Sequence, residues 1–552
     1  MVIIASLILG GGTRPGFLSD VILQLISLPL LLVVLWQSLD QPTSRQMRWA
    51  YAFCFALITV PFIQLIPLPP AIWTLLSNRE PIALSYDLVG HDLPWRPISV
   101  SPHATWLSLI SLIPPVSIFL AILMLSHQER RQLSLIIIAL GLISVFLGLI
   151  QVAQGPESSL RFFDYTNLTE AVGFFANRNH YSALLYSVML FAAVWVIAKM
   201  NTSSSNVDEQ TYDTTRVLIL LAGFTIIVAF IGAQTIARSR AGLGLTIVAL
   251  IGIVALSLAK DQRANRSDSP SLFILTPTKL MAGATLLAVI FATQFALFRV
   301  MERFAKDPLT DARIPFTRNT LEAAEAFIPF GSGMGSFVQV YGIFEKPEDA
   351  LASAYGNRAH NDIAEIWLET GGMGAMLMAL FLIWLIWRAY KIWRSPDSDV
   401  PEINRELAKA ASIVIFLLIA HSLVDYPLRT GAIMAIMAFA CGILIDPVRG
   451  HAPDEEIIEL NHGQIRPSPQ PNVSPHVSPR TQPVDVEWPI EGRQKGAPPQ
   501  APYQPPSPEA WPQEQETTPT TRDTDPQSPW LDEIEWPVEW EKQAKPEDPS
   551  EG

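Results

Sequence analysis

The chain has 552 residues, of which 49% are hydrophobic and 16% are charged, and its mean hydropathy is +0.28. Soluble globular chains are about one quarter charged, so this composition excludes an ordinary soluble protein and indicates an integral membrane protein. The two cysteines, Cys54 and Cys441, both lie inside apolar runs. Their number and position exclude a disulfide framework and a cysteine-based metal site.

The formal net charge of −13 is confined to the C-terminal part of the chain. Residues 451–552 carry 7 Lys and Arg against 20 Asp and Glu, whereas the remainder carries 31 of each kind. The chain therefore consists of a neutral membrane body and an acidic tail. The overall charge gives no argument for a basic or acidic partner, and we expect no nucleic-acid binding.

The tail also differs in composition, since residues 451–552 contain 21 of the 45 prolines and few aliphatic side chains. Such a segment cannot bury a core, so we expect a membrane body at 1–447 and a disordered cytoplasmic tail at 448–552. The tail repeats the pattern Glu-Trp-Pro-aliphatic-Glu at 487–491 and 535–539. It is either a solvating segment or a carrier of short docking motifs.

Apolar runs of about 18–20 residues are long enough to cross a bilayer as helices. They lie near 18–37, 49–68, 106–125, 133–153, 180–198, 216–236, 241–259, 278–298, 372–393, 408–425 and 431–447. Residues 2–10 form a further apolar run, too short to span and treated as a partial first span. The sequence thus predicts an all-α polytopic membrane protein with about 11–12 transmembrane helices.

Basic residues in the short loops predict the orientation. With the N-terminus inside, most clusters of Lys and Arg fall in the cytoplasm, including Arg130 and Arg131. The opposite side holds only two lysines, Lys306 and Lys346, but many arginines. Arginine without lysine is typical of forked recognition of an oxyanion. Two segments on this side are longer than a turn: a Pro-rich loop at 69–105, and the largest loop at 299–371, with room for short helices such as 317–327.

The first candidate site lies near the end of the largest loop, at His360 and Asn361. Asp362 and Glu365 have the spacing of a capping box, which predicts a helix that begins at Asp362. The positive end of the helix dipole would keep the imidazole of His360 neutral, as a general base requires, and would attract phosphate. The alternative is that His360 and Asn361 only cap a helix that enters the membrane.

The second candidate is the pair Arg238 and Arg240, in the turn between two predicted spans. Two guanidinium groups at a membrane edge are costly unless they have partners, and such groups are usually functional. The alternative is that both side chains extend to the lipid headgroups.

The third candidate is the series His421, Asp425 and Arg429. A spacing of four residues puts these side chains on one face of a single helix, although Pro427 interrupts the helix near Arg429. Such a stripe is either a brace between helices or part of a site, and for Arg429 we favour the site.

One further feature precedes the largest loop, and two lie within it. Asn177 and His180 lie in the sequence Gly-Phe-Phe-Ala-Asn-Arg-Asn-His that leads into a span. Arg313 and Arg318 precede a glycine-rich stretch at 331–337, which by itself predicts only tight turns because no phosphate-loop context surrounds it. The sequence contains no Walker motif and no His-Glu-x-x-His or Gly-x-Ser-x-Gly motif, so we expect no cofactor, no metal and an already activated substrate.

These features, in this order, resemble the O-antigen ligase and polysaccharide polymerase family of bacterial inner membranes. The resemblance covers most of residues 1–447, and its most specific element is His360-Asn361 followed after nine residues by Gly371-x-x-Gly374. It implies transfer of a glycan from an undecaprenyl diphosphate carrier to an acceptor hydroxyl on the periplasmic face. The acceptor would be a growing glycan or lipid A-core.

The resemblance also implies roles for particular residues. His360 would be the catalytic base, and the diphosphate would be bound by arginines of the outer side. Those arginines are Arg240, Arg429 and either Arg313 or Arg318, and Arg238 beside Arg240 is a further candidate. Asn361, Asn177, His180, His421 and Asp425 would support the site.

The chemistry of a lipid-linked sugar diphosphate agrees with these assignments. Its leaving group is a stable anion, so the enzyme needs cations for the diphosphate and a base for the acceptor hydroxyl. A polymerase, a ligase and a protein-glycosylating enzyme would all use these residues. The large outer loops slightly favour a polymerase. The tail, which could dock polysaccharide-assembly proteins, does so as well. A flippase for lipid-linked oligosaccharides and a scaffold built on the tail are the other classes considered. The absence of an internal repeat speaks against a transporter.

Overall fold

A computed structural model describes residues 1–14, 18–40, 44–202, 214–264, 283, 313–350, 356–394 and 401–446. The chain divides into two compact units, Met1–Asn461 and His462–Gly552, and every described residue belongs to the first unit. The predicted tail and, apart from Gly283, the predicted span at 278–298 lie outside the described residues.

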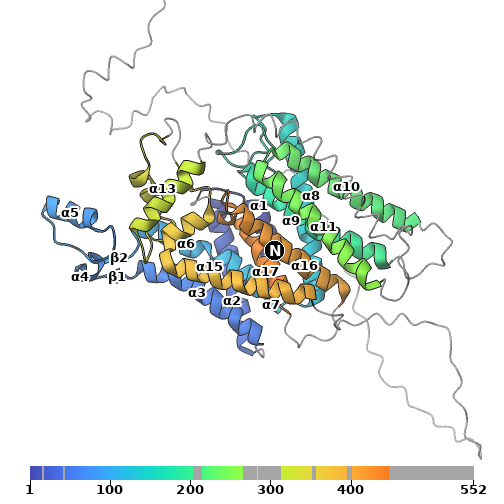
Figure 1. Cartoon of the computed structure of the whole chain (residues 1–552), viewed down its shortest axis with the longest axis horizontal. Coiled ribbons are helices and arrows are strands. Elements are labelled where there is room, and N and C mark those ends of the chain that lie inside the picture. The colour runs from blue at the N-terminus through green and yellow to red at the C-terminus, as the bar shows by residue number, and fades with distance from the viewer. Residues whose placement is uncertain are drawn as a thin grey trace, which may run out of the picture. The chain divides into compact units, whose positions relative to one another are not determined.

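The described part of the chain is helical apart from two short strands, which confirms the all-α polytopic prediction (Figure 1). Ten of the eleven predicted spans coincide with helices or helix pairs. These are α2 (Leu18–Asp40), α3 (Arg45–Leu65), α6 (Pro102–Ser111) with α7 (Ile113–Met124), α8 (His127–Gln154), α9 (Arg178–Thr202), α10 (Thr214–Ala237), α11 (Arg240–Ala264), α15 (Asp362–Arg394), α16 (Glu402–His421) and α17 (Gly431–Ile443). Seven segments in the described residues are long and apolar enough to cross a membrane.

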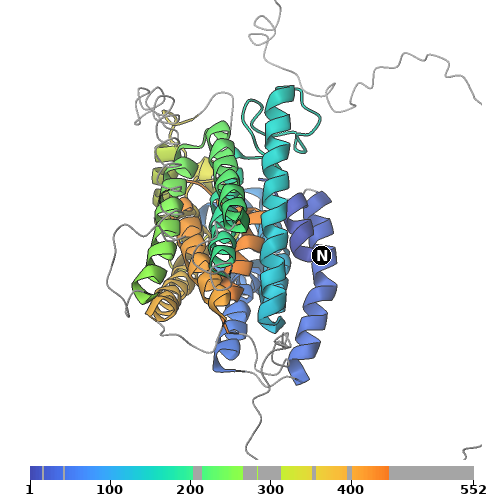
Figure 2. The ribbon, with the colours of Figure 1, turned by 90° about the vertical axis from the view of Figure 1, so that its right-hand side faces the viewer.

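Helix α9 forms the centre of the bundle and packs against α8, α10, α11 and α16 (Figure 2). Its side chains are buried on all sides, as expected for a helix with no polar face. Phe191 of α9 meets Phe439 of α17 edge to face, with ring centroids 5.6 Å apart. The short helix α1 (Val2–Leu9) buries Ile3 and Leu7 in the same core.

Hydrogen bonds of arginine side chains join several helix ends at one end of the bundle. Arg130 at the start of α8 donates to the carbonyl of Gly442 in the last turn of α17 at 3.2 Å and to that of Ile445 just beyond it at 2.6 Å. Arg131 donates to Asn404 at the start of α16, and Arg388 near the end of α15 pairs with Asp446 at 2.8 Å. These arginines belong to the clusters that the sequence assigns to one side of the membrane, and they do meet at one end.

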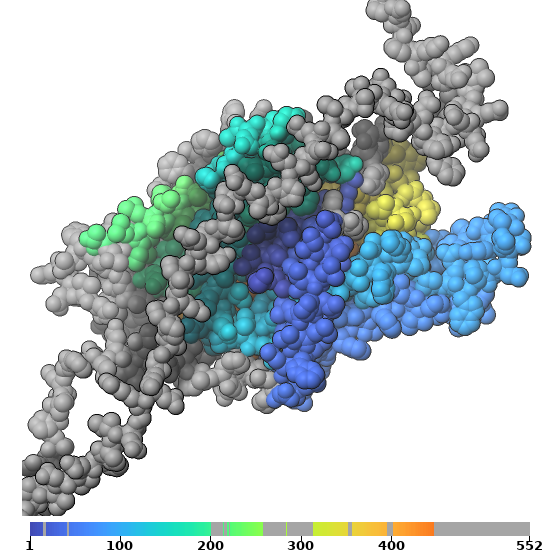
Figure 3. All heavy atoms as spheres, turned by 180° about the vertical axis from the view of Figure 1, so that it is seen from behind, coloured from blue at the N-terminus to red at the C-terminus, as the bar shows by residue number. Residues whose placement is uncertain are grey.

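The opposite end carries the irregular segments. The strands β1 (Pro67–Leu68) and β2 (Arg96–Pro97) pair antiparallel, and the segment between them contains α4 (Pro70–Trp73) and α5 (Glu80–Val89). This hairpin extends away from the helix bundle (Figure 3). The largest predicted loop contains α13 (Arg313–Ala326) and α14 (Phe337–Phe344), and α13 lies close to the predicted short helix at 317–327.

Helix α15 is longer than the predicted span at 372–393, because it begins at Asp362 and continues through a break at Gly371. The backbone of Gly371 has φ 55° and ψ −142°, a conformation that is essentially restricted to glycine. A Cβ atom there would lie 2.3 Å from the carbonyl oxygen of Pro329. The break therefore permits close contact between α15 and the segment that precedes the glycine-rich turns.

The prediction of one helix carrying His421, Asp425 and Arg429 on one face is wrong. Helix α16 ends at His421, Asp425 lies in a turn, and Arg429 ends the short 3-10 helix η2 (Pro427–Arg429). Tyr426 has φ −128° and ψ 52° because the ring of Pro427 disfavours a helical conformation in the preceding residue. The three side chains consequently point to different partners.

Candidate functional site

The centre of the candidate site is a hydrogen bond between His360 and Asp425. Nδ1 of His360 lies 3.1 Å from Oδ1 of Asp425, whose side chain is completely buried. Asp425 also accepts a hydrogen bond from the side-chain amide of Asn179, at the start of α9, and one from the amide of Tyr426 at 3.0 Å. Asp425 thus connects the loop before α15 with the start of α9 and the turn after α16.

Two aromatic rings enclose the imidazole of His360. Phe316 of α13 stacks on it with ring centroids 6.0 Å apart and an interplanar angle of 13°, and Tyr426 contacts it edge-on at 5.0 Å. The His360 side chain is nevertheless 21% exposed. Within the described ranges no hydrogen bond occupies its Nε2 atom. If Nδ1 carries the proton given to Asp425, Nε2 has a free lone pair that can accept a proton.

The pKa of Asp425 lies below its usual range. Burial opposes ionisation, but the hydrogen bond from His360 and the positive charges of the neighbouring histidines and Arg313 outweigh it. Asp425 therefore remains an ionised acceptor, which holds one imidazole tautomer in place and stabilises the imidazolium that forms when Nε2 takes up a proton.

The start of α15 at Asp362 is confirmed, but the predicted capping box is wrong. The cap is Asn361, whose side-chain oxygen accepts hydrogen bonds from the amides of Ile363 and Ala364, both at 3.1 Å. The carboxylates of Asp362 and Glu365 bind other groups instead. His360 lies one residue outside the cap, next to the positive end of the helix dipole.

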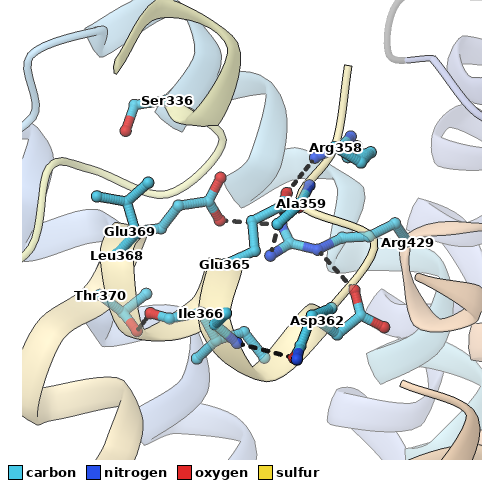
Figure 4. A network of polar contacts seen from close by, with 12 residues as sticks. Ser336, Arg358, Ala359, Asp362, Glu365, Ile366, Leu368, Glu369, Thr370 and Arg429 are labelled. Atoms are coloured by element: carbon cyan, nitrogen blue, oxygen red, sulfur yellow. Dashed lines mark hydrogen bonds and ion pairs between the residues drawn. The ribbon is translucent and has the colours of Figure 1, made fainter. Parts of the chain in front are cut away.

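Arg429 lies inside a cage of carboxylates, as Figure 4 shows. Its guanidinium nitrogens are 3.3 Å from Asp362, 3.5 Å from Glu365 and 2.9 Å from Glu369. Although burial opposes the charge, these three carboxylates raise the pKa of Arg429 above its usual range. Arg358 approaches the same cluster and pairs with Glu365 at 2.7 Å.

This environment speaks against the prediction that Arg429 binds a diphosphate. Its charge is already matched by carboxylates, and its side chain is only 13% exposed. The sequence reasoning missed Arg358 and Glu369, and it assigned Glu365 to a cap. The spacing of Asp362, Glu365 and Glu369, at three and four residues along one helix face, was the available signal.

Arg313 and Arg318, both on α13, have different surroundings. Arg313 donates to the carbonyl of Val424 at 3.1 Å and comes within 3.8 Å of Asp425, with 31% of its side chain exposed. Arg318 pairs with Asp349 at 2.6 Å and is 49% exposed. Only Arg313 therefore lies beside His360 and Asp425.

Arg238 and Arg240 are exposed in the turn between α10 and α11. Helix α11 packs tightly on the first turns of α9, since a Cβ atom on Gly242 would lie 2.4 Å from the Cβ of Ser182. Asn179 begins the same helix and binds Asp425. Both arginines therefore lie at the end of the bundle that carries His360.

The remaining predicted residues lie behind the His360–Asp425 pair. Asn177 accepts a hydrogen bond from the amide of Asn179 at 2.8 Å, and so shapes the turn that presents Asn179. His180 is fully buried and contacts Tyr426 edge-on at 4.9 Å. His421 is also buried, and its Nδ1 atom lies 3.1 Å from the hydroxyl of Tyr186, so it braces α16 against α9. No group of three or more His, Cys, Asp or Glu in the described residues is arranged to hold a metal.

The fold and site define a multi-pass α-helical membrane protein with a polar, arginine-rich site at one end of its bundle. Residues 211–379 match the family model described as O-antigen ligase, which confirms the resemblance to that family. No curated protein and no solved structure matches the chain. The matched stretch contains Arg240, Arg313 and His360 but ends before Asp425. It supports a glycan transfer of the O-antigen ligase or polymerase type, and no finding supports a flippase.

Proposed function

We propose that this protein transfers a glycan from a lipid-linked diphosphate donor to an acceptor hydroxyl, with His360 as the general base. The observation that carries the proposal is the 3.1 Å contact between His360 and the buried Asp425, which leaves Nε2 without a hydrogen bond from the described residues. A buried carboxylate that orients an imidazole in this way is a recurrent arrangement for proton abstraction from a hydroxyl.

In the proposed reaction, Nε2 of His360 takes the proton of the acceptor hydroxyl as the oxygen attacks the anomeric carbon. The new glycosidic bond forms while the bond between that carbon and the diphosphate oxygen breaks, and the lipid diphosphate leaves with the bonding electrons. Asp425 stabilises the transient imidazolium. A single displacement inverts the anomeric configuration, and general-base assistance contributes about 10²–10⁴-fold to the rate.

The diphosphate would be bound by Arg313, Arg238 and Arg240. Arg313 is partly exposed beside Asp425, and the other two are exposed at the same end of the bundle. Guanidinium groups suit a leaving diphosphate because they form charge-assisted, forked hydrogen bonds and need no proton transfer. The proposed set does not include Arg318, which pairs with Asp349 away from His360, or Arg429, which three buried carboxylates surround. It includes no metal.

The proposed setting is the bacterial inner membrane, with the His360 end of the bundle in the periplasm and the C-terminal tail in the cytoplasm. The donor would be an undecaprenyl diphosphate-linked glycan, and the acceptor a growing O-antigen or exopolysaccharide chain, or lipid A-core. Proteins of polysaccharide assembly would be the partners of the tail. The basic clusters at the other end of the bundle support this orientation, because they follow the usual cytoplasmic bias.

The decisive experiment is complementation of a deletion strain with His360→Ala. His103→Ala is the matched control, because His103 is an exposed histidine on α6, outside the site. We expect the control to restore surface polysaccharide and His360→Ala not to restore it, as read on a polysaccharide gel. Normal chain length with His360→Ala would refute the proposal. In the deletion strain, a glycolipid with a single repeat would indicate a polymerase, and bare core with carrier-bound polymer would indicate a ligase.

A further inference from the structure

The carboxylate of Glu365 binds the two residues that precede His360. It pairs with the guanidinium of Arg358 at 2.7 Å and accepts a hydrogen bond from the amide of Ala359 at 3.1 Å (Figure 4). Glu365 is completely buried, and the Oε1 atom that binds Arg358 also lies 3.5 Å from Arg429. The charge that burial makes costly is thus compensated by two guanidinium groups and one backbone amide.

The same stretch of backbone is held from other directions. The carbonyl of Ala359 lies 3.5 Å from the hydroxyl of Thr317 on α13. On the other side of His360, the amide of Asp362 donates to the carbonyl of Ser422, and the hydroxyl of Ser422 donates to the carboxylate of Asp362, both at 2.8 Å. Ser422 belongs to the turn that presents Asp425. These bonds therefore fix both members of the His360–Asp425 pair to one frame.

These hydrogen bonds matter because the backbone of His360 is strained. Its φ is 51°, in the left-handed region, which only a few per cent of non-glycine residues adopt, although His does so more often than most. A residue in this conformation relaxes to φ below zero unless its neighbours prevent it. Relaxation would rotate the imidazole away from Asp425 and from the stacked ring of Phe316.

We propose that Glu365 is a positioning residue, which keeps the strained backbone of His360 in place by binding Arg358 and the Ala359 amide. This inference rests on the proposed function of His360 as a base. Glu365 itself touches no reacting group, so its effect on the reaction passes entirely through the His360–Asp425 pair.

Glu369 provides the matched control. Glu365 and Glu369 are both fully buried on the same helix, and both pair with Arg429, but only Glu365 binds the loop that carries His360. We expect Glu365→Gln to lower kcat by about 10–100-fold, with KM for the donor unchanged, because displacement of a catalytic group by about 1 Å has effects of this size. Glu369→Gln should lower kcat much less. Equal losses in the two variants would overturn the proposal.

A double-mutant cycle with Asp425→Asn separates positioning from a general loss of structure. If Glu365 acts through the pair, Glu365→Gln should cost little more in a protein that already carries Asp425→Asn. If the rate loss of the double variant equals the product of the two single losses, the proposal is overturned. Thermal unfolding in detergent shows whether Glu365→Gln is folded. If it is not, Arg358→Lys serves in its place, because it keeps the charge but removes the guanidinium that pairs with Glu365.

A second measurement does not depend on activity. The rate at which diethyl pyrocarbonate modifies His360, followed by mass spectrometry, reports the orientation and environment of the imidazole. We expect a changed rate in Glu365→Gln and the wild-type rate in Glu369→Gln. An unchanged rate in Glu365→Gln would refute positioning even if His360 is the base. A changed rate together with full activity of His360→Ala would instead refute the proposed function and leave the positioning intact.

Discussion

Oδ1 of Asp425 lies 3.1 Å from Nδ1 of His360, although 65 positions separate the two residues in the sequence. One comes from the loop that precedes the broken helix α15, and the other from the turn that follows α16. The contact therefore exists only when both helices are packed and the turn at Ser422 is bonded to Asp362. This arrangement and the packing around it lead to five testable predictions.

Asp425→Asn should lower the rate of glycan transfer by about 10²–10⁴-fold, because an amide can hold the wrong imidazole tautomer and cannot stabilise the imidazolium. The initial rate with purified protein and lipid-linked donor is the measurement. Asp349→Asn is the control, since Asp349 pairs with Arg318 away from the site and its replacement should change the rate little. Comparable losses in the two variants would contradict a special role for Asp425.

The contribution of Asp425 to the free energy of unfolding should be lost only at low pH. Its pKa in the folded protein is below the ordinary value of 3.8, so the contribution is fully present above pH 3.8 and is lost as the pH falls through the folded-state pKa. The difference in unfolding temperature between the wild type and Asp425→Asn should therefore stay constant from about pH 5 to 8. A difference that shrinks within this range would mean that Asp425 titrates there.

Arg313→Lys should reduce transfer although it keeps the charge, because a lysine cannot donate to the carbonyl of Val424 and also offer a forked pair of donors to a diphosphate. Arg318→Lys, on the same helix, should leave the rate nearly unchanged, since an exposed ion pair contributes about 0–1 kcal/mol. The rates are compared at limiting and saturating donor. If Arg318→Lys were the more damaging variant, the diphosphate would have to bind on the other face of α13.

Gly371→Ala should destabilise the protein, and Gly372→Ala should not. Backbone strain at Gly371 costs about 1–3 kcal/mol for a residue with a side chain, and the clash of its Cβ with Pro329 at 2.3 Å adds to this. At Gly372 the nearest atom to an added Cβ is 3.6 Å away, which is an ordinary contact. Thermal unfolding in detergent measures both variants, and equal unfolding temperatures would argue against the break in α15.

Arg130→Ala should lower the free energy of unfolding by about 2–5 kcal/mol, because several buried carbonyls at the ends of α7 and α17 lose their donor. Arg131→Ala is the control. Among the described residues the guanidinium of Arg131 bonds only the side chain of Asn404, so its loss should cost about 1 kcal/mol. Chemical denaturation in mixed micelles gives both values. A stable Arg130→Ala protein would show that these carbonyls find other partners.

The sequence by itself determined the architecture and the neighbourhood of the site. Apolar length is a local property, so the positions of ten spans could be predicted, and the alternation of spans assigned His360, Arg313 and Arg429 to the same side. The start of α15 at Asp362 was also predictable, because polar residues before an apolar helix mark its first turn. Each of these statements needs only the residues of one segment.

The tertiary structure alone decided which side chains meet. Helical spacing predicts His421, Asp425 and Arg429 on one face, but the helix ends before Pro427. His421 instead contacts α9, Asp425 contacts the loop before α15, and Arg429 contacts the first turns of α15. The sequence predicts that Arg429 binds phosphate, whereas in the fold Asp362, Glu365 and Glu369 surround it. The nearest opposite charges determine what a buried guanidinium can bind, and these charges come from segments that only packing brings together.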